Sequence, residues 1–207
     1  ALHRILKAFH DGAPPPERDA ALARLAELSA AEFAALPAWT ATAWASKWSS
    51  IQPAYIDAWL DWVAHGWHYA SGETDFAVAH SVPGLGDITL HGRIDRVDER
   101  GDARAVIDYK TGAASGLKKK LKDPAEAVQL PFYAWLADAA AAYLPINETP
   151  VAPLELDGET DVDAISRRLP ELLEAIAAGA ALRASGIEAV CGYCEARGLC
   201  RKGMWHV

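Results

Sequence analysis

Two short acidic segments lie close together in the middle of the sequence. They read Gly92-Arg93-Ile94-Asp95-Arg96-Val97-Asp98 and Ala105-Val106-Ile107-Asp108-Tyr109-Lys110-Thr111-Gly112. Residues two apart on a strand share a face, so Asp108 and Lys110 should point the same way, and a hairpin can bring Asp95 beside them. Buried charges are costly unless they are paired or bind a metal. The three residues are therefore candidates for a metal site, with a surface salt bridge between Asp108 and Lys110 as the alternative.

The chemistry indicated by these residues is metal-assisted hydrolysis. Carboxylate and carbonyl oxygens are the ligands that Mg²⁺ and Mn²⁺ prefer. Such a cation stabilises the charge that develops on a phosphoryl group and lowers the pKa of an attacking water. Lys110 could orient that water or help to deprotonate it.

The amino-acid sequence of both segments resembles the PD-(D/E)xK motif of RecB-family nucleases, the branch that includes the AddB nuclease domains. Ile94 stands where the name of the motif has proline. Further motifs are similar, and they occur along this sequence in the same order as in the family. Gln129 and Tyr133 resemble its Gln-x-x-x-Tyr motif, and His3 resembles the end of its Gly-x-x-x-His helix. The resemblance implies an α/β fold, in which a mixed central sheet is flanked by helices and preceded by an N-terminal helical region.

The resemblance also implies a role for each matching residue. The implied metal ligands are His3, Asp95, Asp108 and the carbonyl of Tyr109, and the implied catalytic set is Asp95, Asp108, Lys110, Gln129 and Tyr133. The implied activity is that of a Mg²⁺- or Mn²⁺-dependent DNA exonuclease acting on single strands or duplex ends in repair and recombination. Its implied partner is a helicase subunit or a helicase-like domain. The alternative is a catalytically silent module that binds DNA or scaffolds a recombination complex.

Basic residues near the motifs are candidates for contacts with DNA. They are Arg93, Arg96, Lys118, Lys119, Lys120 and Lys122. The formal net charge of −8 argues mildly against a protein that coats nucleic acid, but it permits a local basic track. We expect the four lysines to lie in a loop that follows the DNA backbone; a merely solvated loop is the alternative.

Three cysteines, Cys191, Cys194 and Cys200, lie near the end of the sequence. In the resembled nucleases that carry an iron–sulfur cluster, three such cysteines join one upstream of the histidine helix to hold a [4Fe–4S] cluster. The fourth ligand would lie before residue 1, so we expect the cluster in the full-length protein. A zinc site that adds His206 is the alternative. Disulfides are disfavoured by the odd number of cysteines and by an expected cytoplasmic location.

The 207 residues fit a single domain, expected to be a fragment of a larger protein. We divide it into a helical region (1–70), a nuclease core (71–186) and a cysteine-containing segment (187–207). No export signal precedes the first helix, and no apolar run approaches the roughly 18 residues that span a bilayer. We therefore expect a cytoplasmic protein without a membrane contact.

The spacing of apolar residues indicates the elements that position the motifs. Period-three-to-four patterns predict helices over 2–10, 19–29, 29–36, 126–144 and 161–184, and an aromatic-rich helical stretch over 39–69. Alternation predicts strands over 76–80, 87–98, 104–109 and 151–156, the first three as an antiparallel meander. The tryptophans of 39–69 are expected in the core, with stacking on DNA bases as the alternative.

Overall fold

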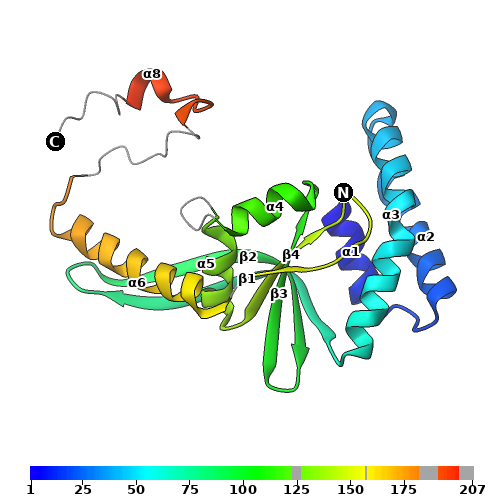
Figure 1. Cartoon of the computed structure of the whole chain (residues 1–207), viewed down its shortest axis with the longest axis horizontal. Helices are drawn as coiled ribbons and strands as arrows, with labels where there is room; N and C mark the ends of the chain where they lie inside the picture. The colour runs from blue at the N-terminus through cyan, green and yellow to red at the C-terminus, as the bar shows by residue number, and fades with distance from the viewer. Residues whose placement is uncertain (123–126, 157, 182–190, 201–207) are drawn as a thin grey trace.

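The computed structural model of the chain describes residues 1–122, 127–156, 158–181 and 191–200. Figure 1 shows a twisted sheet that is packed between helices. The helices are α1 (Leu2–Asp11), α2 (Arg18–Ala34), α3 (Ala38–Ala64), α4 (Ala114–Leu121), α5 (Gln129–Ala137), α6 (Gly158–Ala177) and α8 (Arg197–Cys200). The strands are β1 (His68–Val82), β2 (Gly86–Arg100), β3 (Ala103–Lys110), β4 (Ala140–Pro145) and β5 (Leu154–Glu155).

The sheet is mixed, with the strand order β1-β2-β3-β4-β5. Strands β1, β2 and β3 form an antiparallel meander, as predicted, and β5 is antiparallel to β4. Strand β4 runs parallel to β3, so that Asp108 pairs with Tyr143 and Lys110 with Pro145. A parallel pair needs a crossover connection, and α4 and α5 supply it. The expected α/β fold with a mixed central sheet is confirmed.

The N-terminal helices cover one face of the sheet. Helix α1 buries one apolar face, made of Leu2, Ile5, Leu6 and Phe9, in a core shared with α2, α3, β3 and β4. Trp48, Tyr55 and Trp59 of α3 are buried in the same core. The core assignment of these aromatic residues is therefore confirmed, whereas Trp39 and Trp44 are exposed.

Helix α5 covers the opposite face. Its Leu130 and Ala134 pack with Val97 of β2 and Val106 of β3. Helix α6 contacts α5 and β1. Helices therefore cover both faces of β3. Packing on each face holds the residues at the end of this strand. In the described part of the chain, no helix combines the length and the hydrophobicity needed to cross a bilayer.

Several predicted elements were wrong in extent or type. The helix predicted over 126–144 ends at Ala137, where Asp138 adopts a left-handed conformation (φ 50°), and the chain continues as β4. The local sequence is alanine-rich and favours a helix, but pairing with β3 prevails. The lysine segment forms α4 instead of a loop. One continuous helix, α2, replaces the two predicted over 19–36.

The last predicted elements differ in length. The strand predicted over 151–156 is reduced to β5. Helix α6 ends at Ala177. Residues 182–184 of the predicted helix lie outside the described residues. Strand β1 starts at His68, well before the predicted 76, so β1 and β2 form a long hairpin (Figure 1).

Candidate active site

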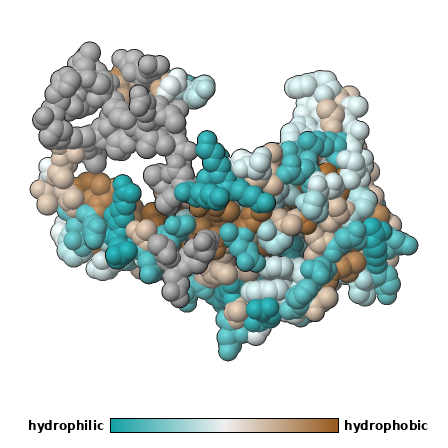
Figure 2. All heavy atoms as spheres, in the orientation of Figure 1, coloured by the Kyte–Doolittle hydropathy of each residue, from teal (hydrophilic) through white to brown (hydrophobic). Residues whose placement is uncertain are grey.

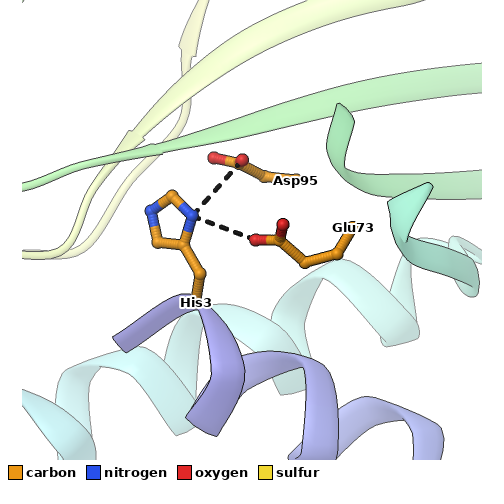
Figure 3. Close-up of side chains that lie close together, drawn as sticks. All are labelled: His3, Glu73 and Asp95. Carbon is orange, nitrogen blue, oxygen red and sulfur yellow. Dashed lines mark hydrogen bonds and ion pairs between the residues drawn. The ribbon is translucent and has the colours of Figure 1, made fainter. Parts of the chain in front are cut away.

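One imidazole and two carboxylates from three separate elements meet beside the sheet. His3 lies in the first turn of α1, Glu73 on β1 and Asp95 on β2, and Figure 3 shows their side chains pointing toward one another. His3 Nδ1 lies 3.1 Å from Glu73 Oε1 and 3.3 Å from Asp95 Oδ1. The three ligand atoms lie within 4.8 Å of one another, a spacing that one metal ion can bridge. Among the described residues, this is the one such group of histidine, cysteine or acidic side chains.

The backbone of β1 is unusual where it presents Glu73. Glu73 has φ 51°, the left-handed region that non-glycine residues seldom adopt. The neighbouring Gly72 fits closely, because a Cβ there would lie 2.6 Å from the Tyr69 hydroxyl and 3.2 Å from the Asp95 carbonyl oxygen. Strain of this kind persists where the surrounding structure imposes it, often at functional sites. Here it accompanies a Glu73 carboxylate that faces His3.

The second oxygen of each carboxylate is also engaged. Asp95 Oδ2 accepts a hydrogen bond from the backbone N–H of Tyr109 at 2.9 Å, and Glu73 Oε2 accepts one from Arg93 Nε at 2.8 Å. Outer hydrogen bonds of this kind orient metal ligands and fix the oxygen that faces the ion. Oδ1 of Asp95 and Oε1 of Glu73 are thereby directed to His3.

A second row of polar side chains leads away from the end of β3. Lys110 Nζ lies 2.5 Å from Asp108 Oδ2 and donates a hydrogen bond to Gln129 Oε1 at 3.1 Å. Gln129 Nε2 in turn donates to the Tyr133 hydroxyl at 3.3 Å. The ring of Tyr143 lies below Lys110 Nζ, 5.4 Å from ring centre to nitrogen. The ammonium group is therefore held from several sides.

Two groups of the site have a raised pKa. The pKa of His3 is raised, mainly by its hydrogen bond to Asp95 and further by Glu73, against the opposing effect of burial. The pKa of Asp108 is raised mainly by burial, and the charges of Lys110 and His3 oppose that shift. Protons therefore compete with a cation for these side chains, because a metal ligand must be deprotonated.

The donor set fits a divalent cation that accepts oxygen and nitrogen ligands. Two carboxylate oxygens and one imidazole nitrogen suit Mn²⁺, and Mg²⁺ prefers the carboxylates. The side chains of Glu73 and Asp95 are 16% and 13% exposed, and that of His3 is 42% exposed, so solvent and substrate can reach the group. These residues can hold such an ion without a change in their elements.

The structure brings together most of the residues that the sequence singled out. His3 and Asp95 are in contact, and Lys110, Gln129 and Tyr133 form one hydrogen-bonded row. The pair between Asp108 and Lys110 exists beside the metal-binding group; its carboxylate is buried (3% exposed), whereas its ammonium side chain is half-buried (29% exposed). The roles of Asp108 and of the Tyr109 carbonyl as metal ligands stay predictions. Glu73 was missed, because an isolated acidic residue carries no motif.

The predicted DNA contacts have different environments. Arg96 is 4% exposed and pairs with the buried Asp98, so its prediction as a DNA contact is wrong. Arg93 is exposed, although it is paired with Glu73. Lys118, Lys119, Lys120 and Lys122 are exposed at the C-terminal end of α4. Figure 2 shows hydrophilic side chains gathered over this helix.

The three cysteines lie within the described residues 191–200. Cys191 and Cys200 are half-buried and Cys194 is exposed. Over residues 191–200 they do not form a close group of metal ligands in the structure. His206, the fourth ligand of the alternative zinc site, lies outside the described residues. The cluster and the zinc site both stay predictions.

The fold and the site together define the class of protein. A family model described as the PD-(D/E)XK nuclease superfamily matches residues 1–201, so the chain belongs to that superfamily. Comparison with curated proteins gives no match. A solved structure described as "Crystal structure of SSO0001" is similar, with 19% identity over 77% of this chain and 79% of that chain and a TM-score of 0.42. Membership of the superfamily suggests nuclease activity.

Proposed function

We propose that the chain is a Mg²⁺- or Mn²⁺-dependent deoxyribonuclease of the RecB/AddB-like branch, acting as an exonuclease on single-stranded DNA or duplex ends. The observation that carries the proposal is the meeting of His3, Glu73 and Asp95 within 4.8 Å. They come from helix α1 and from the two strands of the β1–β2 hairpin. Beside them, at the end of β3, lies Lys110, the lysine of the motif.

His3, Glu73 and Asp95 would hold the cation, with Asp108 and the Tyr109 carbonyl as further ligands. When bound, the cation would stabilise negative charge on the scissile phosphate and lower the pKa of the attacking water. Asp95 keeps one oxygen on the Tyr109 amide, so its other oxygen stays directed to the ion position.

Lys110 would orient the attacking water or assist its deprotonation. Asp108 and Gln129 hold its ammonium group at 2.5 and 3.1 Å, which fixes a side chain that would otherwise be flexible. Fixing a reacting group in this way lowers the entropic part of the barrier. Gln129 and Tyr133 act with it by positioning the lysine and the nearby DNA.

The wider role follows from the resemblance to the branch. We propose that the nuclease works in DNA repair and recombination with a helicase subunit or helicase-like domain, in the cytoplasm. Cys191, Cys194 and Cys200 would be ligands of a [4Fe–4S] cluster in the full-length protein. A zinc site is the alternative metal centre for these cysteines.

The test is a cleavage assay on end-labelled single-stranded and double-stranded DNA with Mn²⁺ or Mg²⁺. Asp108→Ala and Lys110→Ala should abolish cleavage while the circular dichroism spectrum stays native. Asp102→Ala, at an exposed position in the turn between β2 and β3, is the matched control. Loss of label from the ends supports an exonuclease, and internal fragments indicate an endonuclease. Undiminished cleavage by both site variants would refute the assignment, whereas a wild-type protein that binds DNA but does not cleave it would favour a silent DNA-binding module.

A further inference from the structure

A buried polar network lies behind the metal-binding group, on the face of the sheet covered by α1 and α3. Its members are His10, Tyr55, Trp62, Arg96, Asp98 and Tyr109. All of them are buried except Trp62, which is half-buried. None of their side chains is a member of the metal-binding group, and the chemistry described above does not use these side chains.

Arg96 is the centre of this network. Its Nε and one terminal nitrogen donate to the two oxygens of Asp98, at 2.7 and 2.6 Å. Its other terminal nitrogen lies 3.0 Å from His10 Nε2. The same nitrogen donates to the hydroxyl groups of Tyr55 at 3.3 Å and Tyr109 at 3.5 Å. One guanidinium group thus joins α1, α3, β2 and β3.

Stability alone does not explain this arrangement. A buried ion pair rarely stabilises a protein relative to well-packed apolar residues, because removing two charges from water costs as much as their attraction returns. Such a pair does impose a geometry, since every member must stay in place to satisfy the others. Arg96 and Asp98 therefore favour one arrangement of the four elements over others.

Two of these four elements, α1 and β2, carry members of the metal-binding group, and a third, β3, holds one of those members in place. Helix α1 carries both His3 and the network residue His10. Strand β2 carries Asp95 directly before Arg96. Strand β3 carries Tyr109, whose hydroxyl contacts Arg96 and whose backbone N–H holds Asp95. A shift of any of these contacts would move a ligand of the ion.

We propose that Arg96 is a positioning residue, which acts through His10 and Tyr109 to set the ligand geometry of His3 and Asp95 for a divalent cation. The inference rests on the proposed function, because it assumes that the cation binds there. The sequence predicted that Arg96 contacts DNA. The inference instead gives Arg96 a structural contribution to metal affinity.

The test compares the wild-type protein with the double variant Arg96→Met/Asp98→Leu, which removes both charges and keeps apolar volume in the core. Mn²⁺ binding is measured by isothermal titration calorimetry without DNA, and thermal unfolding is measured without metal. The expected result is a cooperatively folded variant that binds Mn²⁺ at least tenfold more weakly. The matched control is Arg18→Gln/Asp57→Asn, which removes an exposed ion pair (2.6 Å) between α2 and α3 and should bind Mn²⁺ like the wild type.

A milder variant decides the question if the double variant does not fold. Tyr55→Phe removes the hydroxyl that contacts His10 at 2.7 Å and Arg96 at 3.3 Å, and it should weaken Mn²⁺ binding at least threefold. If the double variant folds and its Mn²⁺ affinity is within twofold of the wild type, the proposed role of Arg96 is overturned. If the double variant does not fold, the same result for Tyr55→Phe overturns it. A wild-type protein that does not bind Mn²⁺ overturns the proposed function itself, and the inference with it.

Discussion

The Oδ2 atom of Asp95 accepts a hydrogen bond from the backbone N–H of Tyr109 at 2.9 Å. The donor is a backbone group of the neighbouring strand β3 and not a flexible side chain. The position of the carboxylate is therefore set by the strand. The other oxygen, Oδ1, is left to face His3 Nδ1 at 3.3 Å. Folding of the sheet thus orients a ligand before any cation arrives.

Asp95→Asn separates the hydrogen bond of Asp95 from its charge. The amide oxygen can still accept the Tyr109 N–H, so the melting temperature should change by only a few degrees, on the order expected for about 1 kcal/mol. Cleavage should fall by more than about 100-fold, because even outer-shell partners of metal ligands contribute 10–100-fold. Asp75→Asn, at an exposed position on β1, is the control and should leave cleavage unchanged. Normal cleavage by Asp95→Asn would argue against Asp95 as a ligand.

His3 should make the stability of the metal-free protein fall as the pH rises above about 6.5. Its pKa is raised in the folded state, mainly by the hydrogen bond to Asp95. The stability it contributes is fully present below the unfolded pKa and is lost as the pH rises through the folded pKa. Urea denaturation of the wild type and of His3→Gln between pH 6 and pH 9 measures this effect. The difference in free energy of unfolding should shrink with rising pH, and a constant difference would contradict the shift.

His10 should make the stability of the folded protein fall on the acidic side of about pH 6.5, opposite to the window of His3. Burial, reinforced by the charge of Arg96, holds its pKa well below the usual value, so the folded state keeps the imidazole neutral. Below about pH 6.5 the unfolded chain binds a proton that the folded chain does not, at a cost of about 1.4 kcal/mol per pH unit until the folded pKa is reached. His3 adds no slope there, because it is protonated in both states.

The measurement for His10 is the free energy of unfolding at pH 7, 6 and 5, for the wild type and for His10→Gln. Both proteins share the titration of the carboxylates, so the comparison isolates the histidine. The wild type should lose stability more steeply than the variant on acidification. Equal slopes would mean that His10 is protonated in the folded protein.

The lysines of α4 should track the DNA backbone. The backbone N–H of Ala114, in the first turn of α4, donates to Glu148 Oε1 at 2.7 Å, which anchors the helix beside the site. Replacing Lys118, Lys119 and Lys120 with Gln should weaken binding to all DNA sequences alike. The slope of log K against log salt should flatten by about 0.7 to 0.9 for each phosphate that the variant no longer neutralises. Lys47→Gln, at an exposed position of α3, is the control, and an unchanged slope in the triple variant would leave α4 as a solvated helix.

The sequence predicted strand β3 well, because its candidate site residues and its alternation of apolar residues occur in the same segment. Asp108 and Lys110 alternate with buried Ile107 and Tyr109, and the meander that brings Asp95 beside them is marked by clear turns. Strand β4 was not predictable in the same way. Its alanines favour a helix as an isolated segment, and only the pairing with β3 makes them a strand.

The sequence predicted those residues of the candidate site that belong to a local sequence pattern. Glu73 contributes through a left-handed backbone in the middle of β1, and no local pattern indicates that conformation. Arg96 was misassigned because a basic residue beside a candidate catalytic acid is typical of a DNA contact. The available signal was Asp98, two residues further on the same strand, which indicates an ion pair within the sheet.

The central claim is that His3, Glu73 and Asp95 bind the divalent cation that the nuclease uses. Crystals grown with Mn²⁺ and measured by anomalous diffraction locate that ion directly. We predict an anomalous peak bonded to His3 Nδ1, Glu73 Oε1 and Asp95 Oδ1. A peak elsewhere, or none between these three side chains at a Mn²⁺ concentration that supports cleavage, would contradict the account.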